Sequence, residues 1–283
     1  MKLARYEDGH GTHLGVVDGN EIRSLDALSN EFPTMMALIE AGDAGLAKVL
    51  AHIATAPAAI PLDSVRLLAP VERPAKFLAI GMNYRKHAEE ARRLGVAVPD
   101  MQFWFNKQTS CVSGPFDPIE RGVSEQVDYE AELGVVIGKR AKGVSEADAA
   151  SVIFGYLVVN DVSARDWQKH SPTFTMGKSF DTHGPIGPWI VTADEVPNPH
   201  DLELRCYVNG EERQSTNTGD LLHNIWQQIA YLTTAFTLEP GDILATGTPS
   251  GVGIARNPPV FLQSGDVVRC EVHGIGAIEN RVA

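Results

Sequence analysis

The chain reads Tyr129-Glu130-Ala131-Glu132-Leu133-Gly134-Val135-Val136-Ile137-Gly138 near its middle, and this run alternates with a period of two residues. Side chains of a β-strand point to opposite faces in turn, so one face carries Ala131, Leu133, Val135 and Ile137. The other face begins with Glu130 and Glu132 and continues with small residues, which leaves space beside the carboxylates. Two buried carboxylates are costly unless a cation lies between them. The run predicts a buried strand with two carboxylates on one of its faces. The alternative is an edge strand whose charges face water.

A third carboxylate, Asp161, ends a second apolar run that covers residues 155–160. Such a run is typical of a central strand that is covered on both faces. A carboxylate at the end of this strand could join Glu130 and Glu132, and oxygen ligands of this kind suit a hard divalent ion. The alternative role for Asp161 is an N-cap of a helix that starts near Ser163.

Strand-like runs dominate the chain from Lys76 onward. They cover residues 77–80, 131–137, 153–159, 189–191, 202–208, 243–245 and 267–272. Helical patterns are fewer and cover residues 84–94, 146–150 and 221–236. The strands are too many and too irregularly spaced for repeated βαβ units, so we expect a mainly β protein with some α, of the α+β class. The sequence does not fix the strand order.

Residues 1–65 form a small N-terminal α/β domain in this prediction, and residues 66–283 form a second, larger domain. An Asp18-Gly19 turn between short apolar runs indicates a hairpin. Helical spacing follows over residues 33–50. The Ala- and Pro-rich residues 54–61 are interpreted as a linker.

The bulk properties restrict the partners and the location. A formal net charge of −12 argues against nucleic acid or an anionic membrane as a partner. The sequence has no apolar stretch long enough to span a bilayer, and its start lacks the pattern of a secretory signal. Cys111, Cys206 and Cys270 show no metal or redox spacing and are interpreted as buried reduced thiols. We therefore expect a cytoplasmic protein.

His87 and Glu90 lie three residues apart in the predicted helix 84–94. This spacing puts both side chains on one side of the helix, within hydrogen-bonding reach. A histidine oriented by a glutamate can act as a general base and deprotonate water. The alternative is an exposed pair without a role.

Lys178, Arg165 and Gln168 are further candidates because each could meet negative charge. Lys178 lies in a loop of small residues and could neutralise charge that develops on an oxygen. Arg165 and Gln168 follow Asp161 and could bind a substrate carboxylate. Solvated side chains are the alternative for all three.

Gly247 and Thr248 begin a glycine-rich stretch, residues 247–253. It lacks the lysine and the following helix of a P-loop. We expect a tight turn there that brings backbone N–H groups and the Thr248 hydroxyl to a ligand.

Taken in order, these segments resemble the fumarylacetoacetate hydrolase family. The matching stretches are residues 81–84 with His87 and Glu90, then 128–133, 160–166, 177–181, 241–253 and 274–276. The resemblance covers the chain from Leu68 to its C-terminus. It implies a mixed β-sandwich roll, usually a homodimer.

The resemblance also implies roles for individual residues. A Mg²⁺ or Mn²⁺ ion would be held by Glu130, Glu132 and Asp161. The water-activating dyad would be His87 and Glu90, on a segment that often orders as a lid, with Lys178 supporting the site. The positions near substrate would be Arg165, Gln168, Gly247 and Thr248.

Three functions remain open at this point. The first is hydrolysis of a C–C bond in a 2,4-dioxo, acylpyruvate-type acid, a catabolic reaction that releases pyruvate and a carboxylic acid. Here the His87–Glu90 pair would activate water for attack on the 4-oxo carbon. The alternative is a lyase that decarboxylates oxaloacetate or another β-keto acid, and the third is a non-catalytic metal or ligand binder.

The expected substrate is a small anionic 2-oxo acid, although three carboxylates against a divalent ion would leave the site near −1. Residues 92–101 and 103–107 are expected to line the end of the site that receives the acyl group.

Overall fold

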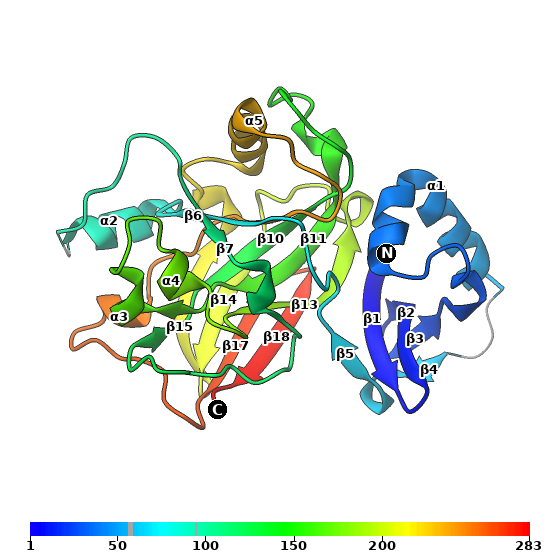
Figure 1. The fold of residues 1–283 in the computed structure, drawn as a ribbon, viewed down its shortest axis with the longest axis horizontal. Helices are drawn as coiled ribbons and strands as arrows, with labels where there is room; N and C mark the ends of the chain where they lie inside the picture. Colours follow the sequence, from blue (N-terminus) through cyan, green and yellow to red (C-terminus); the bar gives the residue numbers. More distant parts are fainter. Residues whose placement is uncertain (56–58, 94) are drawn as a thin grey trace.

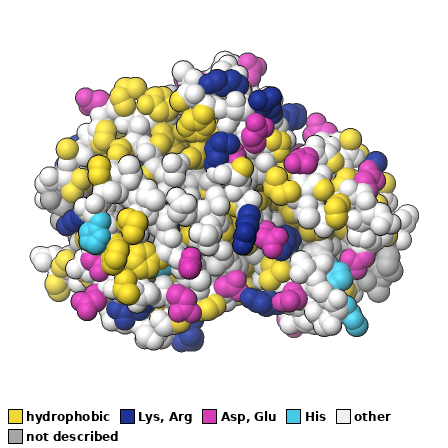
Figure 2. Space-filling model, in the orientation of Figure 1, with side chains coloured by type: hydrophobic (Ala, Val, Ile, Leu, Met, Phe, Trp, Pro, Cys, Tyr) yellow, Lys and Arg dark blue, Asp and Glu magenta, His cyan; other side chains and the backbone are white. Residues whose placement is uncertain are grey.

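The computed structural model describes residues 1–55, 59–93 and 95–283. Two β-sheets pack against each other at its centre, and the helices lie around them (Figure 1). The mixture confirms the predicted α+β class. In the view of Figure 2, Lys and Arg side chains are spread among Asp and Glu side chains.

The larger sheet has twelve strands in the described part of the chain, ten of them in the order β4-β3-β2-β1-β13-β11-β10-β16-β6-β7, with β5 on β1 and β8 on β13. The bounds are β1 Lys2–Asp8, β2 Gly11–Asp18, β3 Glu21–Ser24, β4 Ile60–Pro61, β5 Arg66–Leu68, β6 Phe77–Gly81, β7 Phe103–Lys107, β8 Val112–Ser113, β10 Ala131–Ile137, β11 Ile153–Asn160, β13 Gly184–Thr192 and β16 Ile243–Ala245.

The smaller sheet has four strands among the described residues, in the order β15-β14-β17-β18. They are β14 Glu203–Val208, β15 Glu211–Asn217, β17 Val267–Val272 and β18 Gly276–Arg281. A short ribbon joins β9 Val127–Asp128 to β12 Ser163–Ala164. The α-helices are α1 Met35–Ile53, α2 Arg85–Arg93, α3 Arg165–Gln168, α4 Thr175–Lys178 and α5 Ile225–Ala235.

The period of two in β10 determines how the sheets pack. Its residues Ala131, Leu133, Val135 and Ile137 belong to the core between the two sheets, together with side chains of β14 and β17. Val136, on the opposite face, belongs to the core that the larger sheet shares with α1. The predicted division of this strand into two faces is therefore confirmed.

Gly134 serves a different purpose from the one expected. A Cβ at this position would lie 2.5 Å from Leu157 Cδ1 and 2.7 Å from Val159 Cγ2. The space beside it is thus filled by β11, and the glycine permits close packing between the strands rather than an opening beside the carboxylates.

Two helix predictions were partly wrong: one in where the helix starts, the other in the type of helix. The predicted helix 221–236 starts only at Ile225, because Asn224 and Gln227 form a capping box there. Residues 146–150 do not form an α-helix; a 3₁₀ helix covers Ala149–Val152. The Ser145 hydroxyl accepts the Asp148 N–H at 3.2 Å, and a side-chain hydrogen bond of this kind competes with those of an α-helix.

The N-terminal region joins the larger sheet directly. Lys2 and Leu3 of β1 pair with Val191 and Ile190 of β13, and β5 pairs with the other end of β1. The hairpin of β2 and β3 lies at the predicted turn, while part of the predicted linker, residues 56–58, lies outside the described residues. The division into domains at residue 65 stays a prediction. None of the described helices combines the length and apolarity that crossing a membrane requires.

Candidate active site

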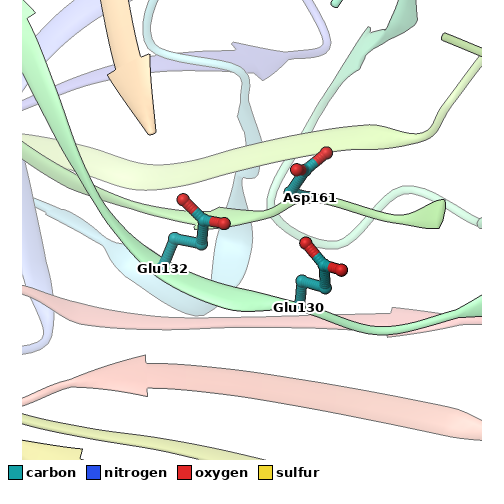
Figure 3. A group of neighbouring side chains, drawn as sticks. All are labelled: Glu130, Glu132 and Asp161. Carbon is teal, nitrogen blue, oxygen red and sulfur yellow. The ribbon is translucent and has the colours of Figure 1, made fainter. Parts of the chain in front are cut away.

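Three carboxylates meet where β10 begins and β11 ends. Glu130 directly precedes β10, Glu132 lies within it, and Asp161 directly follows β11. These strands are antiparallel neighbours, and the Asp161 N–H donates to the Glu130 backbone oxygen at 2.8 Å. One oxygen from each carboxylate lies within 4.8 Å of the others. Figure 3 shows the three side chains extending to the same side of the two strands.

Burial excludes the solvated alternatives for this triad. Glu130 is 6% exposed, Glu132 1% and Asp161 0%, and β10 lies inside the sheet between β11 and β16. The N-cap alternative for Asp161 is wrong, since helix α3 begins at Arg165 with Ala164 at its N-cap position.

Two buried lysines neutralise part of this charge. Lys178 Nζ lies 2.7 Å from Glu130 Oε2 and 2.7 Å from Asp161 Oδ2. Lys107 Nζ lies 2.6 Å from Asp161 Oδ1. Both lysines are 2% exposed, which excludes the solvated-loop interpretation of Lys178. Asp161 therefore receives an ammonium group on each of its oxygens.

Arg165 holds a second carboxylate pair. Its Nε donates to Asp128 Oδ2 at 2.8 Å, and its Nη2 lies 2.7 Å from Glu130 Oε1. Its Nη1 donates to Gln168 Oε1 at 3.1 Å. Most of the guanidinium is thus occupied within the protein, and binding of a substrate by Arg165 and Gln168 stays a prediction.

Glu132 differs from the other two carboxylates. Its Oε2 accepts the Gly247 N–H at 2.6 Å, but no Lys or Arg of the described residues pairs with it. Burial, and then Asp161 and Glu130, raise the pKa of Glu132 well above its ordinary value. Burial would also raise the pKa of Glu130, but Lys178 and Arg165 outweigh it and lower that pKa to about 2.

A divalent ion fits this arrangement. Glu132 is a buried carboxylate without a cation of the chain, and oxygen atoms of two more carboxylates lie within 4.8 Å of it. The triad and Asp128 supply four carboxylates here, and they face three cations, Lys107, Arg165 and Lys178. The formal charge is therefore −1 without a divalent ion and +1 with one. The expectation of −1 with the ion bound omitted these three cations and also the carboxylate of Asp128. A site at +1 suits an anionic substrate.

Gly247 and Thr248 support the triad from a neighbouring turn. Gly247 has a φ of 108°, which favours glycine, and this conformation directs its N–H to Glu132. The Thr248 hydroxyl donates to the Ala131 backbone oxygen at 3.0 Å. The groups expected to meet a ligand are therefore engaged by the protein itself, and substrate contacts of both residues stay a prediction.

His87 and Glu90 form the predicted pair on helix α2. His87 Nδ1 lies 2.9 Å from Glu90 Oε2, and the Gly251 N–H donates to Glu90 Oε1 at 3.1 Å. Both side chains are 14% exposed. In the neutral ring whose Nδ1 donates to Glu90, the other ring nitrogen, Nε2, presents a lone pair. Nε2 has no hydrogen bond to a described residue.

One cavity of about 280 Å³, which we call the site cavity, brings the two groups together. His87 and Glu90 line it from α2, while Glu130, Arg165, Gln168, Lys178 and Thr248 line it from the sheet and from α3 and α4. The acid–base pair therefore shares one cavity with Glu130 of the triad and its cations, whereas Glu132 and Asp161 are not among the described residues that line it.

Three residues were not predicted to belong to the charged part of the site, although residues 103–107 were expected to line its acyl end. Lys107 shares a strand face with Phe103 and Phe105, because residues two apart point the same way, and this spacing was the available signal. Asp128 lies two residues before Glu130 and shows the same signal. Gln214 accepts from the Ala131 N–H at 3.0 Å and donates to Thr248 at 2.9 Å. No local pattern marks it, since its partners are far away in the sequence.

The fold and the site identify the class of protein. The family model described as "Fumarylacetoacetate (FAA) hydrolase C-terminal" matches residues 76–283, and a model described as "Rv2993c-like, N-terminal" matches residues 1–70. The chain belongs to the fumarylacetoacetate hydrolase family, whose members are enzymes that act on oxo acids.

Several proteins with named activities are similar to this chain. A mitochondrial oxaloacetate tautomerase, FAHD2A of Bos taurus, is 43% identical over 100% of this chain and 91% of its own length. A maleylpyruvate hydrolase from Sphingobium sp. SYK-6, solved with manganese(II) and pyruvate, is 35% identical, covers 100% of this chain and 99% of its own, and has a TM-score of 0.84. A 5-carboxymethyl-2-hydroxymuconate delta-isomerase from Mycobacterium smegmatis is 34% identical, covers 100% and 98%, and has a TM-score of 0.78.

Proposed function

We propose that this chain is a metal-dependent tautomerase that interconverts the enol and keto forms of a 2-oxo acid, and that oxaloacetate is the first compound to test. The observation that carries the proposal is the site cavity, where the His87–Glu90 pair faces the charged wall of Glu130, Arg165 and Lys178. The bovine relative, which matches this chain over its whole length, is named an oxaloacetate tautomerase, and this also supports the proposal.

Tautomerisation moves a proton between C3 of the oxo acid and its enol oxygen. His87 Nε2 is the group placed to hold the proton at C3, because Glu90 fixes the ring through Nδ1. Lys178 is placed to stabilise negative charge that develops on the oxygen. Its pairing with Glu130 and Asp161 raises the pKa of Lys178, so it stays an ammonium group, although burial opposes this shift.

The ion itself would be Mg²⁺ or Mn²⁺, held by Glu130, Glu132 and Asp161. When bound, it would supply Lewis-acid polarisation of the oxo acid. The manganese in the maleylpyruvate hydrolase structure supports a metal of this kind.

Hydrolysis of an acylpyruvate C–C bond is the second candidate, although the sequence favoured it first. The hydrogen bond from Gly251 to Glu90 favours it, because a fixed Glu90 orients His87 to deprotonate water. The water oxygen would bond to C4, the C3–C4 bond would break, and C3 would take up a proton. Decarboxylation of a β-keto acid, the third candidate, would need no water. The His87–Glu90 pair would then donate the proton that C3 takes up after CO₂ leaves.

The test uses purified protein that is chelated and then reloaded with Mg²⁺ or Mn²⁺. Loss of the ultraviolet absorbance of enol-oxaloacetate reports tautomerisation, with metal alone as the control for spontaneous reaction. Product identification on a panel of acylpyruvates and on oxaloacetate reports hydrolysis and decarboxylation. Pyruvate from an acylpyruvate, without faster ketonisation of oxaloacetate, would reject the tautomerase in favour of the hydrolase. Ligand-induced stabilisation without any product would indicate a binder.

A homodimer in the cytoplasm completes the proposal. Light scattering of the purified protein tests the dimer. Fractionation of cells tests the location. The competing expectation is a mitochondrial location, which is given in the name of the bovine relative.

A further inference from the structure

The lining of the site cavity changes from charged to apolar next to Lys178. The Phe105 ring lies 4.9 Å below Lys178 Nζ, and the Phe174 ring stacks edge-on against it at 5.9 Å between centroids. Beyond the ammonium group the wall is therefore aromatic. Other apolar side chains that line the cavity are Ile80, Val96, Val252 and Ile254.

Phe174 is held in place by the backbone. Its φ is 61°, a left-handed conformation that non-glycine residues rarely adopt and that concentrates at functional sites. Its carbonyl oxygen accepts the N–H of Gly177 and of Lys178 at 3.0 Å and 3.1 Å. The same turn thus fixes the aromatic ring and the catalytic lysine relative to each other.

Positive charge is scarce in this part of the cavity. Arg165 and Lys178 are paired with Glu130, and the proposed function already assigns Lys178 to the oxygen of the 2-oxo group, so neither is left for a second carboxylate. Lys169 is the one further lysine or arginine among the described residues that line the cavity, and it is exposed. A carboxylate buried against the phenylalanines would lack a partner, which is costly, whereas an apolar group would gain from burial.

We propose that the substrate carries an apolar group, aromatic or aliphatic, on the carbon next to its 2-oxo group, in place of a second carboxylate. This rests on the proposed function, because the 2-oxo acid end must occupy the charged wall for the next carbon to reach Phe105 and Phe174.

Two ligands that cannot be tautomerised separate the possibilities by calorimetry on the Mn²⁺-loaded protein. N-phenyloxamate and N-oxalylglycine share an oxo acid end, but one continues into a phenyl ring and the other into a carboxylate. We expect N-phenyloxamate to bind about tenfold more tightly or better, the scale of discrimination by a hydrophobic pocket. In parallel, the kcat/KM for the enol of phenylpyruvate should exceed that for enol-oxaloacetate.

Variants locate the preference. Phe174→Leu and Ile254→Ala should each weaken N-phenyloxamate about tenfold and leave N-oxalylglycine nearly unchanged. Two variants are used because either substitution could also disturb folding. Met176→Ala is the matched control, since Met176 lies on the same short helix as Lys178 and is 50% exposed.

Tighter binding of N-oxalylglycine, lost in Lys169→Ala, would overturn the inference and assign a dicarboxylic substrate. Equal binding of the two ligands would overturn it as well. Binding of neither ligand would instead reject the 2-oxo acid site of the proposed function itself.

Discussion

Lys107 Nζ lies 2.6 Å from Asp161 Oδ1 and also donates to the Lys178 backbone oxygen at 2.5 Å. One ammonium group on strand β7 therefore holds both a carboxylate of the triad and the segment that carries the second lysine. This contact connects the edge strand of the larger sheet with its buried centre.

Lys107→Met should destabilise the protein by about 3–5 kcal/mol, because it leaves Asp161 with one cation fewer in a buried position. Denaturant unfolding measures the change. Lys139→Met, at an exposed lysine, should stay within about 0.5 kcal/mol. The double variant Lys107→Met/Asp161→Asn should recover part of the loss, and no recovery would show that the lysine acts through packing instead.

Glu132→Gln should remove the response to metal and at the same time stabilise the metal-free protein. The substitution deletes a buried carboxylate that two others repel. Wild-type protein at a metal concentration of 100 times Kd should gain about 2.7 kcal/mol, and the variant almost nothing. Thermal unfolding with and without Mn²⁺ tests this, with the exposed Glu125→Gln as the control. A full metal response in Glu132→Gln would contradict its assignment as a ligand.

His87→Asn should lower kcat for ketonisation by roughly 10²–10⁴-fold, the usual contribution of a general base. Stabilisation by Mn²⁺ should persist, since the histidine is not among the three proposed ligands. Glu89→Gln changes an exposed neighbour on the same helix and should leave kcat unchanged. If His87→Asn kept its activity, the proton would have to be handled by another group.

Stability should depend on pH through His13 in the N-terminal hairpin. Its ring nitrogens lie 2.8 Å from Asp26 Oδ1 and 3.1 Å from Asp8 Oδ1, and the hydrogen bond to Asp26 is the main cause of its raised pKa, against a smaller opposing effect of burial. The folded pKa lies above the unfolded value of about 6.5, so the contribution is complete below that pH and is lost as pH rises through the folded pKa.

The measurement is the difference in Tm between wild type and His13→Gln, which should be largest below about pH 6 and should shrink as the pH rises through the folded pKa of His13. A constant difference for His13→Gln would mean that its ion pairs do not form in solution.

The sequence was most informative where one strand carried its own pattern. Glu130 and Glu132 follow from the alternation of residues 129–138, and the burial of Asp161 follows from the apolar run before it. Lys107 was missed because a lysine at the end of a strand usually faces water. Its true environment depends on β7, β11 and α4 meeting in space, and strand order is not encoded locally.

The boundary between the two family matches falls between residues 70 and 76, whereas the larger sheet runs across it through β1 and β13. Removing residues 1–70 would expose one edge of β13 near Ile190 and Val191, while its other edge stays paired with β11. An open strand edge invites association with other chains. An exchange of N-terminal regions between relatives would therefore have to preserve the pairing of the first residues of β1 with β13, even though these residues are not part of the active site.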